Sequence, residues 1–252
     1  MGTILAKVVG AKIGKQNIIV TCSTEEHSRI KAEELGCDYG DPGEVIENSE
    51  TVFLGIRPQN LEKFTEEYSD AIRKSDSVFV SMLAGVSIER LEKNLGSGKK
   101  IVRIMPNTPS ELGEGIIVYA RNANADEACG AGAAELFAAA GIVEEIAEED
   151  IDIVSVIAGC GPAYAYLFAD SLAKAGTACG LDDERAKKYA AQMLLGSAKM
   201  ILETGKDPEE LKKEVCSPGG TTIEGVKVFE AEGLAEITAR AVKASFNKTR
   251  GM

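Results

Sequence analysis

The residues best suited to binding chemistry lie in one stretch, CSPGGTTIEG, at positions 216–225. Thr221 and Glu224 have the S/T-x-x-E spacing of a capping box, which predicts a helix start near Thr221. Gly219 and Gly220 precede that start, so bare backbone can approach another group closely there. The unpaired N–H groups and the positive end of the helix dipole suit a small anion. The alternative interpretation is an ordinary turn that leads into a capped helix.

The rest of the sequence offers few of the common catalytic side chains. The single histidine, His27, excludes a multi-histidine metal site, and a Ser-His-Asp triad would have to use this residue. Its polar surroundings, TEEHSR, indicate a solvated helix residue instead. The cysteines are scattered without a C-x-x-C pair, which favours reduced thiols over disulfides or a zinc site. We therefore expect no metal site. The cysteines are Cys22, Cys37, Cys129, Cys160, Cys179 and Cys216.

The composition is that of a soluble globular protein, with 44% hydrophobic and 27% charged residues in a chain of 252. The formal net charge of −12, without a Lys/Arg cluster, argues against nucleic acid as a partner. Gly159, Gly161 and Pro162 interrupt the most apolar stretch, residues 153–168, so we predict no membrane span. No basic segment followed by an apolar core begins the sequence, so we expect no cleavable signal and a cytoplasmic protein.

Residues 17–145 alternate short β-branched runs with amphipathic helical patterns such as 58–73 and 87–95. Nearly continuous apolar strands separated by helices predict an α/β domain whose parallel sheet is covered on both faces. Small, polar or glycine residues follow each predicted strand, and ligands of such folds lie at the carboxyl ends of the strands. We therefore expect one shared crevice at these ends. The predicted strands are 17–21, 51–54, 77–80 and 100–104.

Beyond the acidic segment 144–152, strand patterns almost vanish. Small residues at Ala169, Ala173 and Gly176 permit close approach between helices. We predict two domains, residues 1–149 and 150–252. The second is expected to be helical and to supply a dimer interface, with a monomeric helical cap as the alternative. The predicted helices are 163–179, 183–203, 208–215, 221–232 and 234–248.

Five stretches of the sequence resemble the pyrroline-5-carboxylate reductase family, whose members catalyse the last step of proline biosynthesis. They occur in the family's order, cover most of the chain, and end in a segment close to a family signature. The resemblance implies a Rossmann-like parallel sheet followed by an all-α dimerisation domain. It also implies reduction of 1-pyrroline-5-carboxylate to L-proline by hydride from NAD(P)H. The stretches are GIRPQ (55–59), SMLAGVSI (81–88), RIMPNTPSELGEG (103–115), AGCGPAY (158–164) and LKKEVCSPGGTTIEGV (211–226).

The resemblance assigns the CSPGGTT stretch to the substrate. By analogy Ser217, Gly219, Gly220 and Thr221 bind the pyrroline carboxylate, through backbone N–H groups and the serine hydroxyl. Thr222 hydrogen-bonds the ring nitrogen and is the implied catalytic residue. A protonated C=N bond is already electrophilic, so hydride transfer needs mainly an aligned acceptor, without histidine or metal. At its ordinary pKa, Thr222 would orient the imine rather than act as a strong general acid.

NADPH is the cofactor that the resemblance implies, with NADH as the alternative. Ser23 and Thr24 follow a predicted strand and suit a 2′-phosphate, whereas Glu25 and Glu26 suit the ribose hydroxyls of NADH. An equally simple interpretation of the two glutamates is that they only begin a helix. The implied cofactor-binding residues are Met1, Gly2, Ser23, Thr24, Arg57, Pro58, Ala84, Gly85 and Asn107.

The sequence departs from the family at the glycine loop. A dinucleotide-binding fold normally opens with a strand and G-x-G-x-x-G, which this sequence lacks. Met1 and Gly2 resemble the last two residues of that loop, so the first strand is missing from the sequence as given. A start site assigned too far downstream and a genuinely shortened protein are the two explanations. We expect open strand edges, weakened cofactor binding and an unstable first half, unless another segment fills the slot.

The expected partners are a small-molecule substrate and further copies of the chain, in a homodimer or a higher assembly of dimers. The main alternative function is a catalytically weak or silent homologue that keeps only the helical dimer core. A third reading is a relative that acts on another small imine or 2-oxo acid derivative. Retention of both CSPGGTT and MPNTP favours the enzyme, because a scaffold has no evident need for them.

Overall fold

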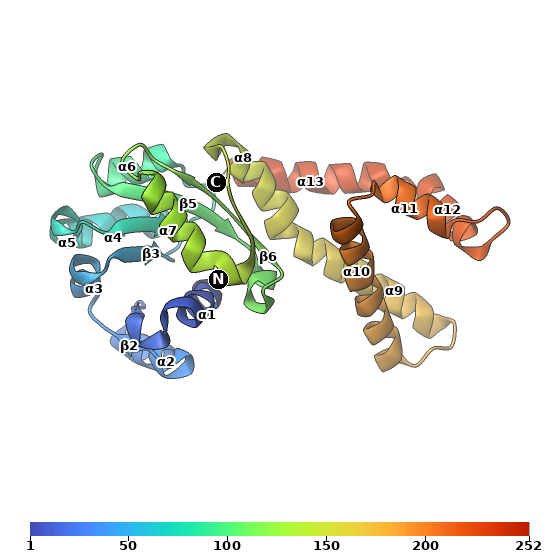
Figure 1. The fold of residues 1–252 in the computed structure, drawn as a ribbon, viewed down its shortest axis with the longest axis horizontal. Coiled ribbons are helices and arrows are strands. Elements are labelled where there is room, and N and C mark those ends of the chain that lie inside the picture. Colours follow the sequence, from blue (N-terminus) through green and yellow to red (C-terminus); the bar gives the residue numbers. More distant parts are fainter. Residues whose placement is uncertain (252) are drawn as a thin grey trace. The chain divides into compact units, whose positions relative to one another are not determined.

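The computed structural model describes residues 1–251, which divide into two compact units (Figure 1). The first unit comprises Met1–Gly159 together with the chain from Phe246 onward, and the second comprises Cys160–Ser245. The first is α/β and the second is helical, as the sequence predicts. The domain boundary placed between residues 149 and 150 stays a prediction.

The strands of the first unit form two separate sheets. A two-stranded parallel sheet has the order β1-β2, and a five-stranded sheet has the order β3-β4-β5-β6-β7. Neither β1 nor β3 has a second partner strand among residues 1–251, which agrees with the expected open edges. The strands are β1 (Ile19–Val20), β2 (Asp38–Tyr39), β3 (Thr51–Leu54), β4 (Val78–Ser81), β5 (Lys100–Pro106), β6 (Gly115–Arg121) and β7 (Gly141–Glu145).

The larger sheet is mixed rather than entirely parallel. Strands β3, β4 and β5 are mutually parallel, but β6 runs antiparallel to β5. Only a short 3-10 helix, η3 (Thr108–Leu112), and its flanking residues join these two strands. A parallel crossover needs a dozen or more residues, so the chain reverses direction here. Strand β7 is again parallel to β6, because a helix connects them.

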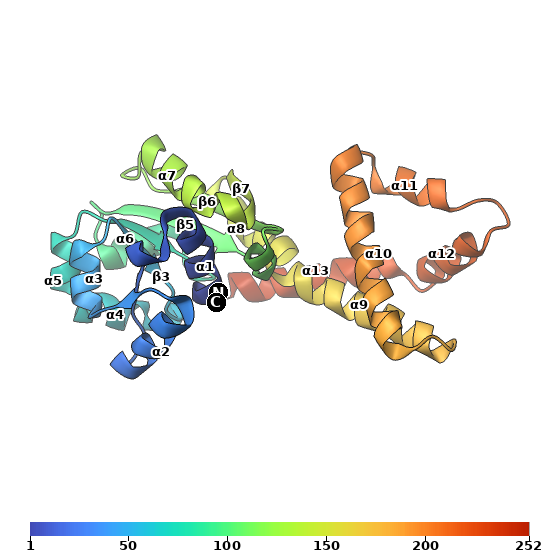
Figure 2. The same ribbon diagram turned by 60° about the horizontal axis from the view of Figure 1, so that its bottom comes forward.

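Helices cover both faces of the larger sheet (Figure 2). Helices α1 and α7 pack on one face with Val80 and Val102, whereas α3 to α6 pack on the other with Phe79 and Ile101. Neighbouring strand residues thus alternate between two buried cores, as expected of a covered sheet. The helices of this unit are α1 (Gly2–Ile13), α2 (Glu25–Leu35), α3 (Pro42–Asn48), α4 (Leu61–Glu67), α5 (Ser69–Lys74), α6 (Ile88–Leu95), α7 (Glu127–Phe137) and α8 (Glu148–Val154).

The helical unit follows the predicted pattern closely. Asp182 and Asp207 accept hydrogen bonds as the N-caps of two of its helices, and Pro208 occupies the first turn after Asp207. The helices are α9 (Gly161–Ala178), α10 (Asp183–Thr204), α11 (Pro208–Val215), α12 (Thr221–Ala231) and α13 (Leu234–Arg250).

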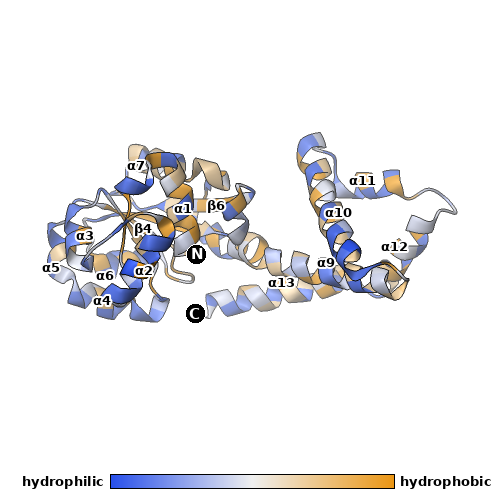
Figure 3. Cartoon of the chain, turned by 90° about the horizontal axis from the view of Figure 1, so that it is seen from below, coloured by the Kyte–Doolittle hydropathy of each residue, from blue (hydrophilic) through white to orange (hydrophobic). Residues whose placement is uncertain are grey.

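A single copy of the helical unit buries little apolar surface. Within residues 160–245 of the described chain, the buried hydrophobic residues are three alanines, Ala173, Ala186 and Ala190. Many large apolar side chains of α9, α10 and α12 are exposed instead, and Figure 3 shows apolar residues along these helices. An exposed apolar surface of this extent marks a protein interface. Examples are Tyr166, Leu167, Tyr189, Leu202, Val228 and Phe229.

The apolar stretch 153–168 differs from its prediction. Gly159, Gly161 and Pro162 do not interrupt it, because helix α8 continues through a π-helix, Ser155–Cys160, into α9. The resulting helix Glu148–Ala178 is long and apolar enough to cross a membrane by length and composition alone. Pro162 has no N–H to donate to the carbonyl four residues before it, Ala158, and that carbonyl accepts from Asn107 Nδ2 at 3.0 Å instead.

We predict that the two sheets differ in hydrogen-exchange protection. A two-stranded sheet is marginal by itself, whereas β4 and β5 are flanked on both sides. Amides of residues 19–20 and 38–39 should exchange at least about tenfold faster than those of 78–81 and 101–104. Exchange followed by mass spectrometry measures this. Equal protection of both sheets would show that β1 and β2 belong to one continuous sheet with the rest.

Candidate active site

The loops after three parallel strands carry the first group of predicted site residues. Arg57, Ala84 with Gly85, and Asn107 follow β3, β4 and β5, which are adjacent and parallel. They therefore lie at one edge of the sheet, where ligands of this fold class bind. Ala84 and Arg57 are exposed, and Gly85 has a φ of 71°, a conformation that favours glycine.

The start of helix α1 provides a second element of this region. Met1 is its N-cap, and no side chain caps the helix. A Cβ atom built on Gly2 would meet no other atom within 4 Å, so there is open space beside the first residue of the helix. Lys7 Nζ donates to Glu111 Oε1 at 2.6 Å, which holds α1 beside the segment that follows Asn107. An uncapped helix start with room beside it fits a phosphate group.

Ser23 and Thr24 follow β1 and so belong to the two-stranded sheet. Thr24 is the N-cap of α2, and its Oγ1 accepts from His27 N at 3.2 Å. Arg29, one turn later, pairs with Glu33 at 3.1 Å. The Thr24 hydroxyl thus already caps the helix, whereas Ser23 is exposed just before it.

Asn107 is buried, and its side-chain amide joins three segments. Nδ2 donates to the Ala158 carbonyl in the π-helix at 3.0 Å, and Oδ1 accepts from Ile116 N at 2.9 Å. Ser110 Oγ also donates to Oδ1, at 3.4 Å. These bonds fix the turn after β5 and tie it to the segment that leads into the helical unit. Asn107 stays a predicted cofactor residue, with a positioning task that the sequence did not indicate.

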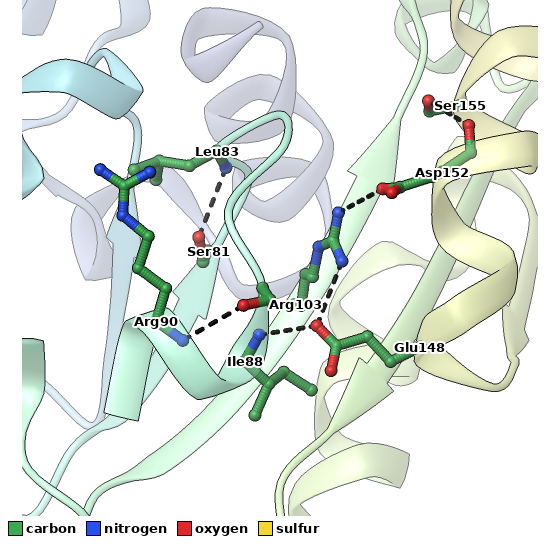
Figure 4. A network of polar contacts seen from close by, with 9 residues as sticks. Ser81, Leu83, Ile88, Arg90, Arg103, Glu148, Asp152 and Ser155 are labelled. Atoms are coloured by element: carbon green, nitrogen blue, oxygen red, sulfur yellow. Dashed lines mark hydrogen bonds and ion pairs between the residues drawn. The ribbon is translucent and has the colours of Figure 1, made fainter. Parts of the chain in front are cut away.

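Sequence reasoning missed a charged network centred on Arg103 (Figure 4). Arg103 lies in β5 with its side chain only 7% exposed, and donates to Glu148 Oε1 at 3.1 Å and Asp152 Oδ1 at 2.8 Å. Glu148 Oε1 also accepts from Ile88 N at 2.6 Å, at the start of α6. Two sequence features could have indicated this network: an arginine inside an apolar strand and the acidic run at 144–152.

The second group of predicted site residues lies within one turn of the helical unit. Gly219 has a φ of 74°, and Gly220 N donates to the Ser217 carbonyl at 3.0 Å, which closes the turn. A Cβ on Gly220 would lie 2.6 Å from Ser217 Oγ, so only glycine leaves that hydroxyl in place. Ser217, Thr221 and Thr222 are exposed.

The capping box predicted at Thr221 does not form. Gly220 is the N-cap of α12, Thr221 is the first helical residue, and no side chain caps the helix. The carboxylate of Glu224 pairs with Lys227 at 2.7 Å instead of reaching back. Because the first-turn N–H groups lack a side-chain cap, the turn offers more donors to an anion than a capping box would leave.

Two of the cysteine thiols lie in surroundings that disfavour the thiolate. Burial raises the pKa of the Cys37 thiol, and burial together with the nearby Asp126 raises that of Cys129. Groups of three or more His, Cys, Asp or Glu side chains that could hold a metal ion do not occur in the part of the chain that the structure describes.

Comparison with known proteins covers nearly the whole chain. A curated pyrroline-5-carboxylate reductase from Aquifex aeolicus is 35% identical over 251 residues, 99% of this chain and 93% of the relative. The chain belongs to the pyrroline-5-carboxylate reductase family. Residues 148–252 match the family description "Pyrroline-5-carboxylate reductase dimerisation", and residues 1–85 match "NADP oxidoreductase coenzyme F420-dependent".

Solved structures of the pyrroline-5-carboxylate reductase family share this fold. The enzyme from Streptococcus pyogenes superposes with a TM-score of 0.91 at 30% identity, over 100% of this chain and 96% of that one. The pyrroline carboxylate reductase of Plasmodium falciparum, solved with NADP bound, gives a TM-score of 0.86 at 28% identity, over 99% and 93%. The assignment to this family made from the sequence motifs is confirmed.

The contacts of Asn107 predict that replacement by aspartate is destabilising. Asn107→Asp removes the donor to Ala158 and places a carboxylate oxygen against that carbonyl. We expect a loss of about 1–3 kcal/mol in the free energy of unfolding, measured by chemical denaturation at fixed protein concentration. Asn48→Asp is the control, since that amide donates to the Glu44 carbonyl at an exposed site. An equal loss in both variants would contradict the positioning task of Asn107.

Proposed function

We propose that this chain reduces 1-pyrroline-5-carboxylate to L-proline with NADPH as the hydride donor. The observation that carries the proposal is membership of the reductase family over nearly the full length, with the CSPGGTT turn intact. The turn combines two exposed threonine hydroxyls, one serine hydroxyl and an uncapped helix start, which suit a small anionic imine.

The residues present fit a dinucleotide at the edge of the larger sheet. The start of α1, with open space at Gly2, would hold the pyrophosphate, while Ala84 and Gly85 would lie against the nucleotide. Arg57, Pro58 and Asn107 would complete this site, and Ser23 and Thr24, which follow β1, would bind the 2′-phosphate. When bound, NADPH supplies a hydride to the C=N carbon of the substrate.

The substrate turn would bind the carboxylate and align the ring. The Ser217 hydroxyl and the N–H groups at the start of α12 would donate to the carboxylate oxygens. Gly220 N already donates to the Ser217 carbonyl, so Gly220 shapes the turn, while Gly219 and Thr221 would lie nearest the anion.

Thr222 would hold the ring nitrogen. Hydride addition to the carbon of a protonated C=N bond converts it into a secondary amine, and the nitrogen keeps its proton. The Thr222 hydroxyl, which both donates and accepts, can hydrogen-bond this nitrogen before and after the transfer. It therefore fixes the angle of the acceptor carbon rather than acting as a strong acid.

The proposed active form is a homodimer, or an assembly of dimers, formed through the helical unit. The match of residues 148–252 to the family's dimerisation region supports this, as do the exposed apolar side chains of α9, α10 and α12. Burial against a second copy also accounts for the apolar helix Glu148–Ala178 without a membrane. We propose a cytoplasmic protein with no nucleic-acid partner.

The proposed reaction is tested by following NADPH oxidation on addition of 1-pyrroline-5-carboxylate. Thr222→Val keeps the shape but removes the hydroxyl, and should lower kcat/KM for this substrate roughly 10- to 100-fold. Thr222→Ser keeps a hydroxyl and should stay within about fivefold of the parent chain. KM for NADPH should not change in either variant. Equal activity of Thr222→Val and the parent would remove Thr222 from the mechanism.

Failure to bind any nucleotide would favour the silent homologue, and turnover only with another imine or 2-oxo acid would favour a relative with a different substrate. Melting temperatures with NADPH, NADP⁺, NADH, proline and pyruvate separate these cases. A shift with NADPH larger than that with NADH supports the proposal. No shift with any nucleotide, in a folded protein, would support a silent helical dimer.

The proposed dimer predicts a selective effect of charge on helix α9. Leu167 is 67% exposed in a single chain and Leu112 is 83% exposed in the first unit. Leu167→Glu should increase the dimer dissociation constant by at least about 100-fold, because a charge in an apolar interface is costly. Leu112→Glu should leave it unchanged. Size-exclusion chromatography with light scattering, at several protein concentrations, measures the mass of both variants. A monomeric parent chain would contradict the proposed assembly.

A further inference from the structure

The loop between β4 and α6 is anchored near Arg103 at both ends. At its beginning, Ser81 Oγ accepts from Leu83 N at 3.3 Å, and Ser81 is the register partner of Arg103 in the adjacent strand. At its end, Ile88 N donates to Glu148 Oε1 at 2.6 Å. The six residues between, 82–87, include Ala84 and Gly85, which stand at the proposed cofactor site.

Ile88 has an unusual partner for the first residue of a helix. The N-cap of α6, Ser87, uses its hydroxyl for Arg90 N at 3.2 Å and leaves Ile88 N to another acceptor. That acceptor comes from a carboxylate 60 residues later in the chain, at the start of α8. The same oxygen accepts from Arg103 Nη1, so the arginine fixes the oxygen that caps the loop (Figure 4).

Asp152 provides a natural comparison with Glu148. It lies one turn later in α8, pairs with the same guanidinium at 2.8 Å, and has nearly the same side-chain exposure, 29% against 30%. In Figure 4 the Asp152 carboxylate meets Arg103, whereas the Glu148 carboxylate meets both Arg103 and Ile88. The two residues thus share the bond to Arg103 and differ in the bond to the start of α6.

We propose that Glu148 is a positioning residue for the cofactor, which acts by fixing loop 82–87 through Ile88 N while Arg103 holds its carboxylate. The fixed loop presents Ala84 and Gly85 to the dinucleotide in one conformation, so less conformational entropy is lost on binding. Asp152 contributes to the stability of α8 but not to the loop. This inference rests on the proposed NADPH-dependent function for its kinetic readout only.

Three variants separate positioning from stability. Glu148→Ala removes the acceptor of Ile88 N and should raise KM for NADPH on the order of tenfold, the effect of one charge-assisted hydrogen bond. KM for 1-pyrroline-5-carboxylate should stay within about twofold. Glu148→Gln keeps an oxygen acceptor and should keep KM for NADPH within about threefold of the parent. Asp152→Ala should lower the melting temperature as Glu148→Ala does, without changing KM for NADPH.

Hydrogen exchange of residues 82–90 gives a second readout that needs no cofactor. Exchange should be faster in Glu148→Ala than in the parent, and unchanged in Asp152→Ala. Equal KM values and equal exchange in the two alanine variants would overturn the inference. If the parent chain does not oxidise NADPH, the proposed function fails, and the exchange experiment still decides whether Glu148 fixes the loop.

Discussion

The end of the sheet that carries the proposed cofactor site is held in place by one buried guanidinium. Arg103 lies in the middle of the sheet, where an unpaired charge would be strongly unfavourable, and the carboxylates of Glu148 and Asp152 compensate it. Because both carboxylates belong to α8, a shift of this helix on the sheet would separate Arg103 from at least one of its partners. The Glu148 carboxylate also accepts from the first N–H group of α6. The Asn107 amide, in the turn after β5, donates to the π-helix. Strand, loop and connecting helix therefore keep one geometry.

Two anions have to be bound by a chain whose net charge is −12. In the proposed sites, backbone N–H groups at the starts of helices α1 and α12 would donate to them, and neither helix is capped by a side chain. Backbone N–H groups and a helix dipole attract an anion locally without requiring a cluster of cationic side chains. Few catalytic side chains are needed for such a reaction, because a protonated imine and a bound hydride donor have to be aligned more than activated by strong acids or bases.

Local patterns predicted much of this fold, and long-range contacts account for what they missed. Strand 51–54 and the helices after residue 160 follow from β-branched runs and caps such as Asp207 with Pro208. The antiparallel strand β6 depends on the short connection after β5, and the predicted capping box failed because Gly220 took the N-cap position. The partners of Arg103 lie 45 and 49 residues away, so no sequence window contains both ends of those bonds. Family motifs located the site residues, whose roles stay predictions.

The most direct measurement of the central claim is a single-turnover reaction with NADPH carrying two deuterium atoms at C4 of the nicotinamide. Equimolar protein, labelled NADPH and 1-pyrroline-5-carboxylate are mixed, and the product is analysed by mass spectrometry. The account predicts L-proline that carries one deuterium, formed at the rate at which NADPH is consumed, because hydride passes directly to the C=N carbon. Unlabelled proline, or no proline from a protein shown to be folded, would contradict it.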